Sequence, residues 1–379
     1  MQTDFDIAIC GAGPVGLGLA AMLIHRGMRA QGVALIDAKT AEQSTRDPRS
    51  IALSWGSRQL LEQLHAWPAS FTSIEQIHVS RRGRFGRTLI DKNNYGLPAL
   101  GYVLRYGAIV SKLTASLEHS GIHILRPASI VDIAEHNGAH ITLQDRPSIT
   151  ANLVIQAEGG LFADQQPKQL HRMYEQTAIV AHVHADMPIA HRAFERFCDE
   201  GPLALLPQED GYALVWCVHP DTARRLLALD DKKFLAELSD AFGGRLGNFT
   251  NVSARNAFPL GLNAQPSDKS RVIAIGNASQ TLHPVAGQGL NLGLRDASVL
   301  ARLLTSGLAT AEVVAQFAQS RKDDRNLTIH LTDIMARIFT SRHRDSPTQT
   351  LLGLSLGLVD GFAPGKKMLA DQMMFGHRT

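Results

Sequence analysis

Residues 4–16 read DFDIAICGAGPVG, so a short apolar run leads directly into glycines spaced as GxGxxG. The run predicts a buried strand, the glycines a tight turn, residues 17–26 a helix and residues 33–38 a second strand. A glycine turn between a strand and a helix lets backbone amides approach a pyrophosphate. Asp37 closes the second strand, where a carboxylate can hydrogen-bond a ribose hydroxyl. The opening of the chain therefore predicts a dinucleotide-binding βαβ unit.

A second glycine-rich segment, residues 271–296, reads RVIAIGNASQTLHPVAGQGLNLGLRD. It predicts a strand that ends at Gly276-Asn277, a proline-containing loop, and a helix that begins near Gly287 to Leu290. A helix start carries about +0.5 of a unit charge and donates free amides, so this helix would stabilise an anion that forms on a ring beside it. Because the first motif suits FAD and NAD equally, the second segment has to separate them.

The stretch between the two motifs changes its periodicity several times. Residues 54–67 have helical spacing, residues 74–90 resemble a hairpin with a basic turn, and Asp210-Gly211 predicts a second hairpin turn. These patterns favour an α/β plus β architecture, in which a Rossmann-like three-layer domain carries an inserted antiparallel-sheet domain and a C-terminal helical tail. The expected boundaries are 1–73, 100–176 and 260–335 for the dinucleotide-binding domain, 74–99 and 177–259 for the sheet domain, and 336–379 for the tail.

The composition of the chain is that of a globular protein with more than one core. Its 379 residues exceed the usual single-domain size, and 44% are hydrophobic while 19% are charged. A net charge of +3 is too small to indicate nucleic-acid binding. The three cysteines, Cys10, Cys198 and Cys217, form no CxxC pair, so neither disulfides nor a zinc site are expected. We see no export signal and no apolar run of spanning length, which favours a cytoplasmic location.

The segment at 271–296 resembles the second FAD motif of the flavin monooxygenases related to para-hydroxybenzoate hydroxylase. Within that family the chain is most similar to the ubiquinone-biosynthesis hydroxylases, in particular the branch that acts on polyprenylated methoxyphenols. FERFCDEGPLALLP at 194–207 and RSIALSWGSRQLL at 49–61 extend the resemblance over nearly the whole chain. The resemblance implies bound FAD, NADH or NADPH as a transiently docked reductant, and dioxygen and a prenylated phenol as co-substrates. No second GxGxxG follows a strand, so a separate NAD domain is not expected.

The resemblance also implies which residues hold the cofactor. The ADP half of FAD would lie against the first motif, at Gly11, Gly13, Pro14, Val15, Gly16 and Asp37. The ribityl chain and the isoalloxazine would lie against the second, at Asn277, Pro284, Gly287, Gly289, Leu290 and Asn291. Arg49, in the RSIAL match, would approach the ribityl or pyrophosphate region. Asn277 stands where many relatives have Asp, and the methoxyphenol branch is similar to this chain in having Asn there.

Two positions depart from the family pattern. Glu158 occupies the place of an aspartate in QAEGG at 156–160, where the family has ADG. Arg105 stands in GYVLRYG, where relatives often have an acidic residue. Each is a candidate flavin contact or, equally, an ordinary charge at a strand end. No side chain is identified as a general base.

Histidines on one predicted strand raise the question of a metal site. His182 and His184 share a strand face, and His191 follows soon after. No carboxylate stands at ligand spacing along the chain, so ordinary sheet histidines and no bound metal are expected. A contact of His182 with a substrate phenol is the functional alternative.

Two further segments suggest surfaces for partners. The stretch RRGRFGR at 81–87 is expected to be a solvated hairpin tip, with docking of a partner protein as the alternative and nucleic acid disfavoured. The tail carries glycines at four-residue spacing and the apolar stretch MLADQMMF at 368–375. These residues suit core packing, or an interfacial helix with at most peripheral contact with the inner membrane.

The residues and the resemblance together predict an FAD-dependent aromatic hydroxylase of ubiquinone biosynthesis. Two alternatives stay open. One is a flavin hydroxylase of another aromatic substrate or ring position. The other is a non-catalytic flavin-binding subunit among other ubiquinone-biosynthesis proteins, suggested by Glu158 and by the lack of an evident base.

Overall fold

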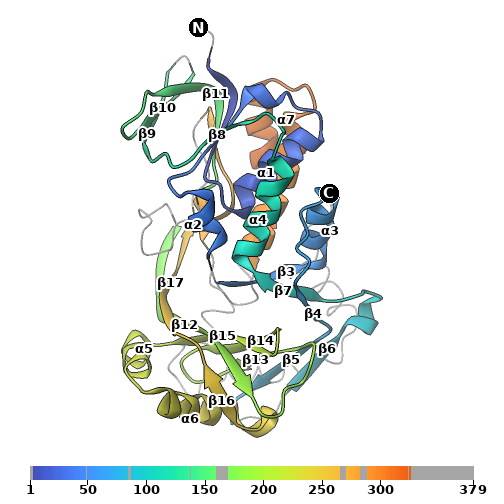
Figure 1. Ribbon diagram of the computed structural model, residues 1–379, viewed down its shortest axis with the longest axis vertical. Helices are drawn as coiled ribbons and strands as arrows, with labels where there is room; N and C mark the ends of the chain where they lie inside the picture. Colours follow the sequence, from blue (N-terminus) through green and yellow to red (C-terminus); the bar gives the residue numbers. More distant parts are fainter. Residues whose placement is uncertain are drawn as a thin grey trace.

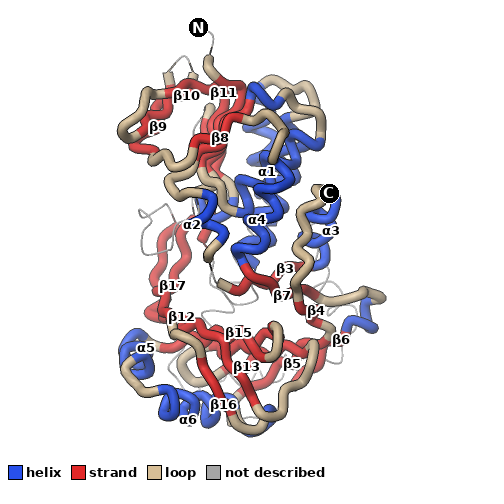
Figure 2. Tube along the Cα trace, in the orientation of Figure 1, coloured by secondary structure: helices blue, strands red, loops and turns tan. Residues whose placement is uncertain are grey.

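The computed structural model describes residues 3–47, 49–83, 87–136, 138–158, 170–264, 270–281, 288–322 and 324–325. One sheet lies at each end of the long axis of the molecule, and a small third sheet lies between them (Figures 1 and 2). The two large sheets have separate hydrophobic cores. The chain therefore forms two packed units joined by strands that run between them.

The first sheet carries the N-terminal motif. Its order is β8-β2-β1-β11-β10-β9, and β18 pairs with the end of β11. The pairs that involve β1, β2, β8 and β18 are parallel, whereas β9, β10 and β11 form an antiparallel meander. The strands are β1 (Phe5–Cys10), β2 (Val33–Ile36), β8 (His123–Leu125), β9 (Ile130–Glu135), β10 (Ala139–Leu143), β11 (Ile149–Gln156) and β18 (Val272–Ala274).

Helices cover one face of this sheet. α1 (Pro14–His25), α4 (Tyr106–Leu117) and α7 (Gln288–Leu304) lie together beside it in Figure 1. They bury Ile9 and Leu35, while the neighbouring Ala8 and Ile36 face the meander, because side chains alternate along a strand. Helices, parallel sheet and meander are the three layers of a Rossmann-like domain.

The small third sheet and two short helices complete this unit. Its order is β3-β7-β4, all antiparallel, and Ser50 of β3 pairs with Arg105 of β7. A capping box at Thr40 and Gln43 starts α2, and the Ser54 hydroxyl caps α3. The elements are β3 (Ser50–Ser54), β4 (Thr72–Ile74), β7 (Gly101–Arg105), α2 (Ala41–Thr45) and α3 (Trp55–Gln63).

The second large sheet has the order β19-β17-β12-β15-β14-β13-β5-β6, with β16 paired to β12. All its neighbours are antiparallel except β13 and β5. Helices α5 and α6 cover one face, and Phe194 and Trp216 are in the core beneath them. The elements are β5 (Gln76–Arg81), β6 (Arg87–Asp91), β12 (Leu170–Ala185), β13 (Arg192–Phe197), β14 (Pro202–Gln208), β15 (Gly211–Val218), α5 (Pro220–Leu227), α6 (Asp231–Phe242), β16 (Phe249–Val252), β17 (Asn256–Ala264) and β19 (Gln280–Thr281).

The predicted Rossmann-like domain and the inserted antiparallel-sheet domain are confirmed, and one turn is displaced by a residue. Gln208 pairs with Gly211, so the turn residues are Glu209 and Asp210, and Glu209 has the positive φ of 55°. Gly211 is needed for a different reason. A side chain there would collide with the Val183 carbonyl oxygen on the neighbouring strand β12.

Other expectations remain predictions after the fold is known. β12 begins at Leu170 and β17 ends at Ala264, so both cross the predicted domain boundaries. The tail and the tip of the basic turn at 84–86 lie outside the described residues, although Arg82 pairs with Asp240 of α6 at 2.6 Å. Within the described ranges, no helix is long and apolar enough to cross a membrane.

Candidate functional site

The first glycine motif folds into a tight cradle at the start of α1. Gly11 has a φ of +106°, and a side chain there would meet the backbone of Ala157 at 2.7 Å. A side chain on Gly16 would overlap the Gly11 carbonyl oxygen. Gly13 is the N-cap of α1, no side chain caps that helix, and Pro14 occupies its first turn. An uncapped helix start behind a glycine turn fits a pyrophosphate, since its amides are left to donate.

Asp37 braces this cradle from the end of β2. Its Oδ2 accepts a hydrogen bond from the Ala12 amide at 2.6 Å, and its Oδ1 accepts one from the Lys39 amide at 2.7 Å. The Arg126 guanidinium lies 4.0 Å from the carboxylate. The structure thus places Asp37 at the first motif, and its contact with a ribose hydroxyl stays a prediction.

The second glycine motif presses directly on the first. Val15 lies between Gly276 and Gly293, where added side chains would come within 3.3 Å and 2.7 Å of its methyl groups. A side chain added at Gly18 would likewise begin 3.3 Å from the Leu294 side chain. Small residues let two backbones approach closely. The two motifs, far apart in sequence, therefore make one continuous surface at the start of α1 and α7.

The structure describes only some of the residues that are predicted to contact the flavin ring and the ribityl chain. Asn277 lies in a 3₁₀ turn at Gly276–Ala278 that follows β18, and its Oδ1 is 3.8 Å from where a Gly289 side chain would begin. Leu290 packs against the core of the first domain. Pro284 and Gly287 lie outside the described residues. The structure brings Asn277 and Gly289 together, while their contacts with flavin stay predictions.

Asn291 has a structural task that the sequence does not reveal. Its side chain is buried, and its Oδ1 accepts hydrogen bonds from the Ser54 amide at 2.8 Å and the Ser57 hydroxyl at 2.7 Å. Its Nδ2 donates to the Ala52 carbonyl at 3.2 Å. These bonds fasten the first turns of α7 to the junction of β3 and α3, so Asn291 positions the second motif.

Arg49 lies close to the first motif, and the Tyr106 ring lies between them. Its guanidinium pairs with Asp47 at 2.7 Å and stacks over the Tyr106 ring at 4.6 Å from the centroid. A side chain on Gly13 would meet the Tyr106 hydroxyl at 3.0 Å. Arg49, half exposed, therefore stands at the edge of the cradle, and its contact with the ribityl or pyrophosphate region stays a prediction.

The two residues that depart from the family pattern have different surroundings. Glu158 follows β11 beside Gly11, and partial desolvation together with the charge of Asp37 raises the pKa of its carboxyl. Arg105 forms a two-bond ion pair with Glu209 at 2.8 and 3.0 Å. Glu209 sits at the hairpin tip of the second sheet, so Arg105 ties the two units together. Flavin contacts of both residues stay predictions.

A buried charge network holds the second motif from behind. Asp296 is fully buried and accepts hydrogen bonds from Arg321 at 2.8 Å, from Arg325 at 3.1 Å and from the Gly276 amide at 3.3 Å. Asp324 binds Arg321 from the other side at 2.5 Å. The positive charges of Arg325 and Arg321 overcome the effect of burial, so the pKa of Asp296 lies below its usual value. Asp296 belongs to the second motif, but no pattern in the sequence identifies Arg321 and Arg325 as its partners.

Glu195, on strand β13 of the second sheet, is a partly buried acid that the sequence does not single out. Along β13, Phe194 points into the core under the helices, whereas Ala193 packs with Ile74 and Val103 of the small sheet. Glu195 therefore faces the first domain by the same alternation. Burial raises the pKa of its carboxyl to about 7.

The raised pKa of Glu195 predicts a stability that falls with pH. Below about pH 4.5 the folded and unfolded chains both hold the proton. Between there and the folded pKa of about 7 only the unfolded chain releases it, so stability is lost as pH rises through this window. Because part of the side chain reaches solvent, we expect a loss of about 2 kcal/mol above pH 7. Glu195→Gln should melt higher than the parent at pH 8 and equally at pH 4.5, by calorimetry. The exposed Glu118→Gln is the control, and identical pH slopes for parent and E195Q would contradict the expectation.

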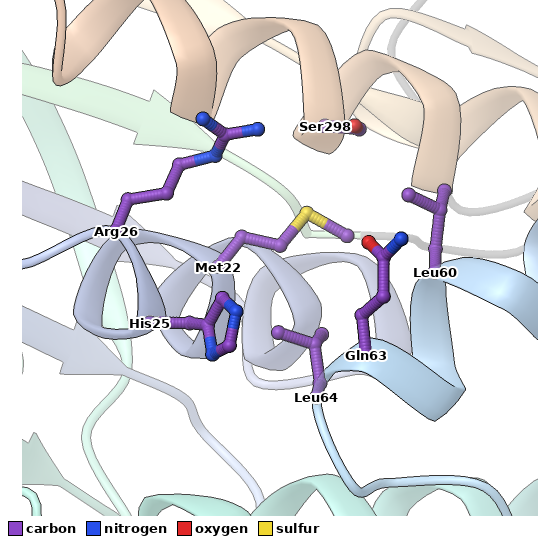
Figure 3. A pocket seen from close by; sticks show the side chains of 7 residues that line it. All are labelled: Met22, His25, Arg26, Leu60, Gln63, Leu64 and Ser298. Atoms are coloured by element: carbon purple, nitrogen blue, oxygen red, sulfur yellow. The ribbon is translucent and has the colours of Figure 1, made fainter.

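A surface cavity of about 320 Å³ lies apart from this site. Figure 3 shows it between the C-terminal part of α1, α3 and α7, at the opposite end of α1 from the glycine turn. It is lined by Met22, His25, Arg26, Leu60, Gln63, Leu64 and Ser298.

The glycine cradle, the second motif fitted against it and the adjoining sheet are those of a dinucleotide-binding domain, to which a second sheet unit is joined. A family model described as FAD binding domain matches residues 126–323, more than half of the chain. The chain is 32% identical to an uncharacterized protein of Synechocystis sp., over 99% of this chain and 94% of that one. It is 30% identical to 3-demethoxyubiquinol 3-hydroxylase of Escherichia coli, over 82% of each.

Among solved structures, p-nitrophenol 4-monooxygenase PnpA of Pseudomonas putida shares the fold, with a TM-score of 0.75, 16% identity and full coverage of both chains. The chain belongs to the FAD-dependent monooxygenases of the ubiquinone-hydroxylase family. FAD is its cofactor, and the uncapped start of α1 with its glycine turn fits the pyrophosphate of that molecule.

Proposed function

We propose that this monooxygenase hydroxylates the ring of a polyprenylated methoxyphenol in ubiquinone biosynthesis, with NADH or NADPH as reductant and dioxygen as oxidant. The contact of Val15 with Gly276 and Gly293 supports it most, because it joins both FAD motifs into one surface. The relative of Escherichia coli is named a demethoxyubiquinol hydroxylase, which favours a quinone-ring substrate.

In this reaction the residues of the chain would bind FAD and orient its ring system. Bound FAD supplies hydride acceptance and oxygen activation. The amides at the start of α1 would hold the pyrophosphate, and Asp37 would keep the Gly11–Gly13 turn in shape through the Ala12 amide. The first turn of α7, anchored by Asn291, would direct its amides toward the ring system.

The second sheet carries a small apolar cluster on the face that turns away from its helices. On the face away from α5 and α6, Ala178, Cys217 and Leu260 pack together with Val215. The first three residues are at most 9% exposed, so the cluster forms part of the packed core of the sheet. Burial also raises the pKa of the Cys217 thiol, which keeps it neutral and unreactive.

Product analysis tests the proposal directly. The FAD-loaded protein is supplied with NADH or NADPH, ¹⁸O₂ and a methoxyphenol that carries a short prenyl chain. We expect reductant oxidation that depends on the phenol, and one labelled oxygen atom in the ring of the product. Reductant consumption with only hydrogen peroxide as product, for every phenol offered, would overturn the hydroxylase assignment. Quinone intermediates that accumulate in cells lacking the protein would then report the ring position.

A non-catalytic flavin-binding subunit is the second candidate. The carboxylates of Glu158 and Asp37 both lie at the glycine turn, and the charge of Asp37 contributes to the raised pKa of Glu158. Glu158 also stands where the family has a shorter aspartate, so this substitution could alter catalysis by the bound flavin while leaving its binding intact. Full hydroxylation by Glu158→Asp together with none by the parent chain would favour this reading.

A further inference from the structure

Two histidines and one aspartate meet where the second sheet contacts the first domain. His182 and His184 extend from the same face of β12, with ring centroids 4.9 Å apart. The Oδ1 atom of Asp210, at the tip of the β14–β15 hairpin, lies 3.1 Å from His184 Nε2 and 3.7 Å from His182 Nε2. The fold thus supplies the carboxylate that spacing along the chain does not. We propose that His182, His184 and Asp210 bind one divalent transition-metal ion of the zinc type.

The backbone around the cluster leaves room for it. β12 and β15 are antiparallel neighbours with His182 opposite Ala213, and Gly211 begins the strand beside the two rings. A side chain on Gly211 would lie 2.9 Å from His182 Nε2 and 3.3 Å from His184 Cδ2. Any other residue at 211 would therefore displace the imidazoles, and the glycine keeps all three ligand atoms within 4.8 Å of one another.

The imidazole nitrogens lack other partners. Both ring nitrogens of His182 and the Nδ1 atom of His184 are buried and make no hydrogen bond to any described residue. Buried polar atoms are almost always satisfied, by protein, water or an ion.

The ligand set selects the kind of ion. Two imidazoles and one carboxylate suit zinc, copper or nickel, whereas magnesium and calcium prefer oxygen alone. Bonds of about 2.0–2.1 Å in a tetrahedron place ligand atoms about 3.3 Å apart. The separations of 3.1 and 3.7 Å to Asp210 approach that value, so side-chain rotation is enough to close the site. Asp210 is largely exposed, which leaves the fourth position to water.

The surrounding charges tolerate such an ion. Arg105 is a cation close to the cluster, and its ion pair with Glu209 offsets its charge. Glu209 is also fixed by its amide, which donates to the Thr72 hydroxyl at 3.1 Å. A bound ion would join β12 to a hairpin tip that already contacts the first domain. The ion would stiffen that junction, and this structural effect is separate from the proposed hydroxylation reaction.

A zinc titration tests the site in the FAD-loaded, full-length protein after treatment with a chelator. Competition with a chromophoric chelator should show one zinc ion per chain. We expect His184→Ala and Asp210→Asn each to weaken zinc affinity at least tenfold, and to remove the rise in melting temperature that zinc chloride produces in the parent. His191→Ala is the matched control, since His191 lies outside the cluster and contacts Ser73 at 2.9 Å.

Two results would overturn the proposal. One is zinc affinity unchanged in both variants, and the other is zinc binding weaker than the millimolar range in the parent. Asp210 is exposed at a turn, so Asp210→Asn should fold even where a strand histidine variant does not. The flavin spectrum and melting temperature without zinc verify the fold of each variant independently of hydroxylase activity.

Discussion

Asp296→Ala is expected to destabilise the protein by about 3–5 kcal/mol, because it leaves Arg321 and Arg325 buried without their counter-ion. The Gly276 amide loses an acceptor at the same time. Since Gly276 contacts Val15 of the first motif, we expect FAD affinity to fall with stability. Denaturant unfolding of the FAD-loaded protein measures the first effect, and flavin release on dilution measures the second.

The control for this prediction is an ion pair on the surface. The exposed side chains of Arg224 and Asp221 are paired on helix α5, and Asp221→Ala should change stability by less than about 1 kcal/mol. Asp296→Asn keeps the shape and can still accept one hydrogen bond, so its effect should be intermediate. Equal stability of D296A and the parent would show that the network contributes nothing.

Gly16→Val is expected to abolish FAD binding. Its side chain would overlap the Gly11 carbonyl oxygen, so the turn that presents the amides of α1 could not close. We expect at least a hundredfold loss of FAD affinity, and a colourless protein on purification. Flavin absorbance per chain and fluorescence titration with FAD provide the measurement.

Two further glycine variants distinguish a specific effect of the cradle on FAD binding from a general effect of backbone strain on stability. Gly27 has a φ of +86° with nothing within 4 Å, so Gly27→Ala should cost about 1–2 kcal/mol and retain FAD. The methyl group added by Gly13→Ala would meet only the Tyr106 hydroxyl, which can move. We therefore expect this variant to fold and to bind FAD more weakly than the parent. Normal flavin content in both G16V and G13A would contradict the predicted role of the turn.

The sequence predicts the parts of this fold that depend on neighbouring residues. Apolar runs ending at Gly11 and Gly276 mark β1 and the strand before the second motif because buried parallel strands and glycine turns have local signatures. The hairpin of β5 and β6 follows from alternation over 74–90. These features need no knowledge of which distant segments come together.

What the sequence cannot predict depends on contacts between distant segments. Asn291 stays a predicted flavin contact, but its buried hydrogen bonds to Ser54 and Ser57 join residues far apart in the sequence. Asp210 reaches His184 only because β12 lies beside β15. The displaced hairpin turn has the same origin, since the position of Gly211 is dictated by the neighbouring strand rather than by the turn. Such pairings have no local periodicity to reveal them.

The close fit of Val15 against Gly276 and Gly293 has a consequence for biosynthesis on the ribosome. β1 and α1 emerge first, but α7, which covers α1, emerges only after the whole second sheet. Until then the apolar face of α1 lacks one of its partners, and long-range contacts of this kind form slowly. Nascent chains that stop before Gly293 should therefore depend on chaperones and bind no FAD, whereas the second sheet, with its own core, can fold earlier.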